Sequence, residues 1–184
     1  MLRVFLLFFC CLFVQSDTEP VLSWNTSYKL SWEDFKGEPK NLGSAVAVTA
    51  SGITFGFSVR HSNERVVSFD SEVHAHFYPE QSWYDAKRAT PHILGHEQLH
   101  FDITELHARK FRQRIAQLEV SNAVRKELKA VHRAINRELS EMQDAYDNET
   151  DYSRQVEAQI LWERYIKKEL EKLDEFKSVN LIEY

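Results

Sequence analysis

The stretch of this chain with the clearest chemical meaning is His96-Glu97-Gln98-Leu99-His100, which has the form HExxH. In an α-helix, positions i and i+4 lie one turn apart on the same face, so the imidazoles of His96 and His100 can bind one metal ion. Zinc held by neutral nitrogen ligands acidifies a bound water, and Glu97 is near enough to take the proton without being a ligand. The motif therefore predicts His96 and His100 as zinc ligands and Glu97 as the general base.

The HExxH motif alone is weak evidence, because it would occur by chance in about 3–4% of shuffled sequences of this composition. The residues around the motif support this interpretation. Thr90 is a favourable N-cap and Pro91 a favourable first helical residue, which predicts a long helix from Pro91 towards Leu118. Both histidines lie within its broad apolar face, which contains Ile93, Leu99, Ile103, Leu106, Phe111 and Ile115. Histidines on such a face need a polar partner or a metal, and zinc is favoured over two hydrogen-bonded core histidines.

A catalytic zinc usually has a third protein ligand and one open position, so a third ligand must be sought. Glu105 lies too far around a straight helix from the motif and is better placed for a surface ion pair with Arg109 at i+4. His74 and His76 alternate on one face of a predicted strand, where they are either ligands or an exposed pair.

The acidic stretch from Tyr146 to Arg154, at the start of the last predicted helix, is the other candidate source of a third ligand. It combines several carboxylates with the phenol of Tyr152. Its alternative explanation is helix capping by Asp151 or Ser153, with the acidic groups favouring the helix dipole.

Strand-forming residues dominate the segment before the motif. They run from Ala45 to Val59 and from Val66 to Tyr78, with a polar hairpin turn at Arg60 to Arg65. A loop with packing residues Trp83 and Tyr84 follows. Further upstream, the residues expected to anchor a short segment on the body are Leu30, Trp32 and Phe35.

Two amphipathic helices are predicted after the motif helix. The first is capped by Ser121 or Asn122, and a turn at Asp147 to Asp151 separates it from the second. The order of elements predicts an α+β domain in which a small antiparallel sheet is followed by three helices, with HExxH on the first long helix. We expect that helix to lie against the sheet, with a sheet edge near the metal where an extended peptide could add as a strand.

The N-terminus resembles a secretory signal. An apolar run from Val4 to Val14 follows one positive charge and is too short to span a bilayer comfortably. We therefore expect a cleaved signal at residues 1–16, with an uncleaved membrane anchor as the alternative. Both cysteines, Cys10 and Cys11, fall inside this segment, so core packing and bound metal must stabilise the mature chain.

Length and composition bound the remaining possibilities. Residues 17–184 are about one domain's worth of chain, and a hydrophobic content of 43% is ample for a packed core. The net charge of -5 gives no basic surface, so nucleic acid is not an expected partner. We expect a secreted or periplasmic protein without stable membrane insertion after signal cleavage.

Several longer motifs resemble the predicted secreted zinc-dependent proteases of bacteria, a family long catalogued as a domain of unknown function. They cover nearly the whole mature chain and comprise Trp32-x-Asp-Phe-x-Gly-x-Pro39, Ala47-Val-Thr-Ala-Ser-Gly-Ile-Thr-Phe-Gly56, Ser82-Trp83, His96-Glu-Gln-Leu-His-Phe-Asp-Ile-Thr-Glu105 and Tyr146-Asp-x-Glu-Thr150. The resemblance implies a zincin-like metalloprotease domain at residues 17–184, with zinc bound by His96 and His100 and with Glu97 as base.

The family pattern also bears on the third ligand. Many relatives have histidine two positions after the Glu-Thr pair, where this chain has Tyr152. If that position supplies the third ligand, Tyr152 binds zinc through its phenol oxygen or the site is weakened; Glu105, His74 and His76 remain the alternatives.

The expected function is therefore a secreted zinc-dependent peptidase acting on a peptide or protein substrate, in which Glu97 activates a zinc-bound water. The competing interpretation is a secreted zinc-binding or interaction protein without turnover, in which Tyr152 marks a degraded site. A structural domain without metal is the third possibility.

Overall fold

A computed structural model describes residues 20–40 and 45–178. The predicted signal at residues 1–16 lies outside the described residues. A sheet of three strands, in the order β1-β4-β3, is made by β1 (Leu22–Ser23), β3 (Ser51–Ser62) and β4 (Arg65–Phe77), all antiparallel. The helices α1 (Pro91–Ala116), α2 (Val124–Glu149) and α3 (Val156–Lys172) follow. The predicted α+β order, a small antiparallel sheet followed by three helices, is confirmed.

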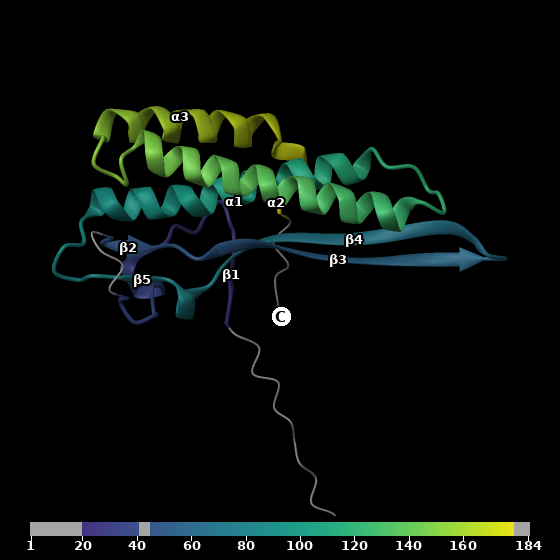
Figure 1. Cartoon of the computed structure of the whole chain (residues 1–184), viewed down its shortest axis with the longest axis horizontal. Coiled ribbons are helices and arrows are strands. Elements are labelled where there is room, and N and C mark those ends of the chain that lie inside the picture. Colours follow the sequence, from purple (N-terminus) through teal and green to yellow (C-terminus); the bar gives the residue numbers. More distant parts are fainter. Residues whose placement is uncertain (1–19, 41–44, 179–184) are drawn as a thin grey trace, which may run out of the picture.

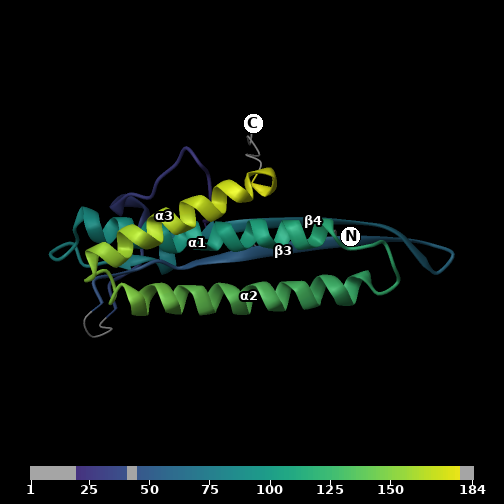
Figure 2. The ribbon, with the colours of Figure 1, turned by 90° about the horizontal axis from the view of Figure 1, so that it is seen from above.

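The three helices cover one face of the β3–β4 hairpin (Figure 1). Viewed from above, α1 lies over the hairpin between α2 and α3 (Figure 2). This central place gives α1 neighbours on three sides, which explains why buried residues occur around most of its circumference.

The β3–β4 hairpin is one long ribbon. Its second strand, β4, runs without interruption from Arg65 to Phe77, close to the predicted stretch from Val66 to Tyr78. Alternate residues face the helices and join the core, among them Phe55, Val73, Ala75 and Phe77. The turn is shorter than predicted and consists of Asn63 and Glu64, both with positive φ.

The helix that carries HExxH begins as predicted. Thr90 is the N-cap, its hydroxyl accepts from the backbone N–H of Ile93, and Pro91 is the first helical residue. The helix ends at Ala116, close to the predicted limit. His96, Glu97 and Leu99 are buried within it.

The boundaries of α2 differ from the prediction at both ends. Its N-cap is Ala123, because Asn122 instead uses its side-chain oxygen to accept from the backbone N–H of Val66 on β4. At the other end the expected turn is still helical as far as Glu149, so Asp147 lies in the last turn of α2. Within the described residues, none of the helices is long and apolar enough to span a membrane.

The segment upstream of the hairpin anchors a second, two-stranded sheet. Leu30 and Phe35 are buried as predicted, and Trp32, in a short 3-10 helix (Trp32–Asp34), stacks on Tyr84 at 4.6 Å between ring centroids. Tyr84 belongs to β5 (Trp83–Tyr84), which pairs with β2 (Ala47–Val48). A further 3-10 turn (Pro79–Gln81) leads from β4 into β5.

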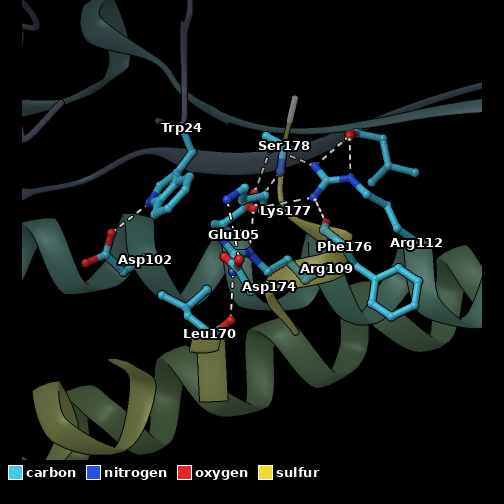
Figure 3. Close-up of polar contacts among 11 residues, drawn as sticks. Trp24, Asp102, Glu105, Arg109, Arg112, Leu170, Asp174, Phe176, Lys177 and Ser178 are labelled. Atoms are coloured by element: carbon cyan, nitrogen blue, oxygen red, sulfur yellow. Dashed lines mark hydrogen bonds and ion pairs between the residues drawn. The ribbon is translucent and has the colours of Figure 1, made fainter. Parts of the chain in front are cut away.

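A buried ionic network fixes the far half of α1 (Figure 3). Arg109 Nε donates to Glu105 at 2.9 Å, as the spacing predicts, but the pair is not at the surface: Glu105 is 0% and Arg109 3% exposed. Arg112 donates to Val73 O on β4 and to the hydroxyl of Ser178, which follows the final 3-10 turn (Asp174–Phe176). Ser178 in turn donates to Glu105. The network therefore ties α1 to the sheet and to the end of the described chain.

The hairpin turn yields a first prediction. Both turn residues have positive φ, the geometry of a two-residue turn that favours Asn-Gly, and Glu64 (φ 63°) has a side chain there. We expect Glu64→Gly to raise the free energy of unfolding by about 1 kcal/mol, because it removes left-handed strain. Urea denaturation checks this. Ser58→Gly, in an extended part of β3, should instead destabilise, and equal effects of both changes would contradict the explanation.

The buried histidine of α1 yields a second prediction. His107 is fully buried, its Nδ1–H donates to Ile103 O, and burial lowers its pKa from 6.5 to about 4. Stability from the neutral ring is complete above pH 6.5 and falls as the pH drops towards 4, by up to about 3 kcal/mol, because the unfolded chain takes up the proton first. In His107→Leu the unfolding free energy should vary less over this pH range. His61→Gln, at an exposed histidine, should keep the wild-type profile.

Candidate metal centre

Three potential ligand atoms converge beside the middle of the molecule. His96 and His100 lie one turn apart on α1, and Asp147 reaches them from the last turn of α2. The Nε2 atoms of His96 and His100 are 3.2 Å apart and lie 3.1 and 3.0 Å, respectively, from Asp147 Oδ1. Among the described His, Cys, Asp and Glu residues, this is the group of three that could hold a metal ion.

The distances fit a tetrahedral ion. Zinc lies about 2.0–2.1 Å from nitrogen and carboxylate ligands, and in a regular tetrahedron that bond length separates two ligand atoms by about 3.3 Å. The observed sides of 3.0 to 3.2 Å are close to this value. A zinc ion held by these three ligands would have one further position for water.

The hydrogen bonds of His100 provide an independent test of fit. Gln143 donates its Nε2–H to His100 O, and this orients the Oε1 of Gln143 towards the Nδ1 of His100. The Oε1 atom therefore accepts a hydrogen bond from the Nδ1–H of His100. A neutral His100 protonated at Nδ1 has a lone pair at Nε2, which then points at the Asp147 carboxylate and at His96. This lone pair and the carboxylate oxygen of Asp147 repel each other. A cation between these atoms would remove the repulsion, so the arrangement of the ligand atoms suits a positive ion.

The pKa shifts at the site follow from the same arrangement. Burial by itself would raise the pKa of Asp147, but hydrogen bonds from His100 and His96 hold it well below its usual range. Burial would lower the pKa of His100, yet the hydrogen bond with Asp147 and the negative charge of Glu97 raise it overall. The site thus favours an ionised carboxylate and draws positive charge, whether from a proton or a metal.

Tyr146 fixes the orientation of both imidazoles. It is fully buried on α2, stacks on the His96 ring at 4.4 Å and meets the His100 ring edge-on at 5.0 Å. Burial also raises the pKa of Tyr146, so its phenol stays neutral. The remaining ring nitrogen of His96, Nδ1, is buried and has no hydrogen-bond partner among the residues that the structure describes. Tyr146 therefore packs against both rings, both Nε2 atoms lie within hydrogen-bond distance of Asp147, and Gln143 contacts the Nδ1 of His100 alone.

Glu97 lines the same cavity as the three ligand atoms. The cavity has a volume of about 610 Å³, with residues 45–49 on one side, the HExxH turn on the other and residues 152–154 at the rim. Glu97 is 5% exposed, and its carboxylate makes no hydrogen bond or ion pair with another described residue. Thr49 donates to the backbone oxygen of Glu97 and so joins the wall near β2 to α1. The Glu97 side chain thus lines the cavity that also contains the three ligand atoms.

Tyr152, the predicted third ligand, lines this cavity but is 59% exposed. It lies in a loop where Asp151, Tyr152 and Ser153 all have positive φ, and the Nε2 of His92 lies 2.7 Å from Ser153 O. The loop keeps Tyr152 at the rim, while Asp147 occupies the position beside the imidazoles.

The other candidate ligands lie elsewhere. The carboxylate of Glu105 is enclosed by Arg109, Arg112 and Ser178 in the network of Figure 3. His74 and His76 lie on β4, on the face opposite the core residues, with ring centroids 5.8 Å apart. The structure therefore brings His96, Glu97 and His100 together but leaves Glu105, His74 and His76 outside the cavity.

Asp147 lies in the acidic stretch from Tyr146 to Arg154 but is not among the ligands predicted from sequence. The sequence predicts a turn at this residue, and a turn leaves the direction of the Asp147 side chain undefined. The signal is the spacing of α2: Gln143 and Asp147 are four residues apart, beside the apolar stripe that contains Leu139 and Tyr146. A helix continued through Asp147 places its carboxylate one turn beyond Gln143, facing α1.

A family profile described as "Bacterial protein of unknown function (DUF922)" matches residues 22–154. The chain belongs to the DUF922 family. The DUF922 match begins at β1 and ends within the loop between α2 and α3, so it includes Glu97 and the three candidate ligands. No curated protein and no solved structure matches the chain significantly. The predicted membership of a bacterial family of unknown function is confirmed at this level.

The ligand set yields a third prediction. We expect Asp147→Asn to lower zinc affinity by at least about 100-fold, and Gln143→Leu to lower it about 10- to 100-fold because His100 loses its orienting partner. Tyr152→Phe should leave zinc affinity unchanged. Competition with a chromogenic zinc chelator measures all three. Zinc loss in Tyr152→Phe together with normal binding in Asp147→Asn would make the phenol the third ligand instead.

Proposed function

We propose that this DUF922 protein is a zinc-dependent peptidase of the bacterial cell envelope. The observation that carries the proposal is the convergence of His96, His100 and Asp147 within 4.8 Å beside Glu97 in one cavity. The HExxH motif supplies two ligands and the base, and the helix α2 supplies a third ligand while a fourth coordination position stays open. A zincin-like fold and activity are part of the proposal.

Each side chain has a defined role in peptide hydrolysis. His96, His100 and Asp147 would hold the ion, which when bound polarises the scissile carbonyl and acidifies water. Glu97 accepts the proton of the attacking water on its carboxylate and delivers it to the nitrogen of the leaving amine. Because Glu97 is buried beside the cavity, the proton is transferred away from bulk solvent.

The wall of the cavity suits an extended substrate. Residues 45–49, which include β2, line the side facing the HExxH turn, where sequence analysis expected a sheet edge. A peptide lying along this wall would pass directly over the ligand atoms, and backbone hydrogen bonds to a strand would bind it without demanding a particular side chain.

The location rests on sequence. An apolar N-terminal run, followed by a mature chain without cysteine, favours export across the inner membrane and cleavage of residues 1–16.

The alternative function, a zinc-binding or interaction protein without turnover, depended on Tyr152 as a degraded ligand position. Asp147 provides an ionisable ligand close to both histidines, so the geometry favours the peptidase.

The fourth prediction separates the two functions. We expect Glu97→Gln to bind zinc normally while losing about 10²- to 10⁴-fold in the rate of peptide cleavage, because only the proton acceptor is removed. Cleavage of a mixed peptide pool, followed by mass spectrometry with and without chelator, is the measurement. Glu141→Gln, at an exposed site on α2, serves as the matched control. Chelator-sensitive cleavage that persists in Glu97→Gln would end the peptidase proposal, and zinc binding without any cleavage would support the alternative.

A further inference from the structure

The histidine pair on β4 is unused by the metal centre described above. His74 and His76 project from the sheet face opposite Val73, Ala75 and Phe77, which are buried against the helices. The sheet therefore lies between this pair and the ligand atoms on α1 and α2. Whatever the pair binds, it binds independently of the proposed peptidase.

The two imidazoles are neighbours on a rigid support. Their ring centroids are 5.8 Å apart and their planes differ by 22°, so both rings stand side by side. His76 pairs with Gly52 on β3 and with Ser23 on β1, and His74 pairs with Thr54 on β3. With strands on one or both sides, the backbone that carries the rings is fixed, and only side-chain rotation is needed to bring two ring nitrogens onto one ion.

Two glycines of the opposing strand lie in the same row as the rings. The cross-strand partner of His76 is Gly52, and Glu72, the preceding residue of the row, faces Gly56. A Cβ added at Gly56 would meet nothing within 4 Å, and one added at Gly52 would meet the ring of Tyr78 at 3.5 Å. The absence of a side chain at Gly52 therefore lets the Tyr78 ring lie beside it next to His76, whereas the surface at Gly56, opposite Glu72, is open.

The protonation of the pair suits a metal ligand. His76 Nδ1 lies 3.1 Å from the hydroxyl of Thr54, which leaves its Nε2 available. Partial burial and the charge of the neighbouring His74 lower the pKa of His76, so its ring is neutral at pH 7. Glu72, exposed two residues earlier on the same face, adds negative charge that favours a cation.

We propose that His74 and His76 form a second metal site on the outer face of the sheet, which binds a divalent transition-metal ion through two imidazoles. Imidazole ligands suit Cu²⁺, Ni²⁺ and Zn²⁺, and Cu²⁺ binds most tightly in this series. Water completes the coordination, since the site is open to solvent.

Direct titration with Cu²⁺ tests the site. The protein should carry no histidine tag and should contain His96→Ala together with Asp147→Asn, which removes the pair of imidazoles of the first centre and leaves the outer site to be observed. We expect His74→Ala and His76→Ala each to weaken Cu²⁺ binding by about tenfold or more, as measured by calorimetry. The Cu²⁺ electron paramagnetic resonance spectrum should show coupling to two imidazole nitrogens, and to one in either variant.

Two controls keep the result decisive. His61→Ala removes an exposed histidine of the same hairpin whose cross-strand partner on β4 is Val66, and it should leave Cu²⁺ affinity unchanged. Gly52→Val keeps both imidazoles but crowds the Tyr78 ring beside His76, and it should weaken binding, whereas Gly56→Val, opposite Glu72, should not. Unaltered Cu²⁺ affinity in both histidine variants, or an equal loss in His61→Ala, would overturn the second site, whatever the outcome for the peptidase.

Discussion

The contact between the last turn of α2 and the first half of α1 is the constraint on which the rest of the structure depends. It places one carboxylate against two imidazoles in a half-buried position, where unpaired polar groups are costly. Tyr146 supplies the apolar part of the contact, and Gln143 supplies its hydrogen bonds. Apolar packing alone would allow α2 to shift along its axis relative to α1. The polar groups of the two helices can pair in only one register, and so they fix the position of α2.

The sheet determines where that contact can form. The apolar side of the β3–β4 hairpin supports α1 along its length, and the short sheet of β2 and β5 lies beside the HExxH turn. Trp32 stacked on Tyr84 connects this short sheet to the upstream segment, while Gln98 on α1 accepts from the backbone N–H of Leu30. One face of α1 therefore carries the candidate ligands His96 and His100, and its other faces contact the elements that line the cavity.

Features controlled by local chemistry were predictable from the sequence. Thr90 and Pro91 start α1 as expected, and the spacing of His96 and His100 places both imidazoles together. Features controlled by distant partners were not. The side-chain oxygen of Asn122 accepts a hydrogen bond from the backbone of Val66, so Asn122 does not cap α2. Glu105 is buried because Arg112 and Ser178, near the end of the described chain, enclose its carboxylate. Predicting Asp147 as a ligand would have required both the C-terminal boundary of α2 and the register between α1 and α2.

The enclosure of Glu105 also has a consequence for the order of assembly. Ser178, which helps to satisfy this carboxylate, follows it by 73 residues, and so reaches it only when nearly all of the chain has been made. During synthesis from the N-terminus, Arg109 and Arg112 can already pair with Glu105 within α1, but its carboxylate would lack the two hydrogen bonds from Ser178 until the end of the chain arrives. The hydrogen bonds that complete the surroundings of Glu105 on α1 are therefore among the last that the chain can form.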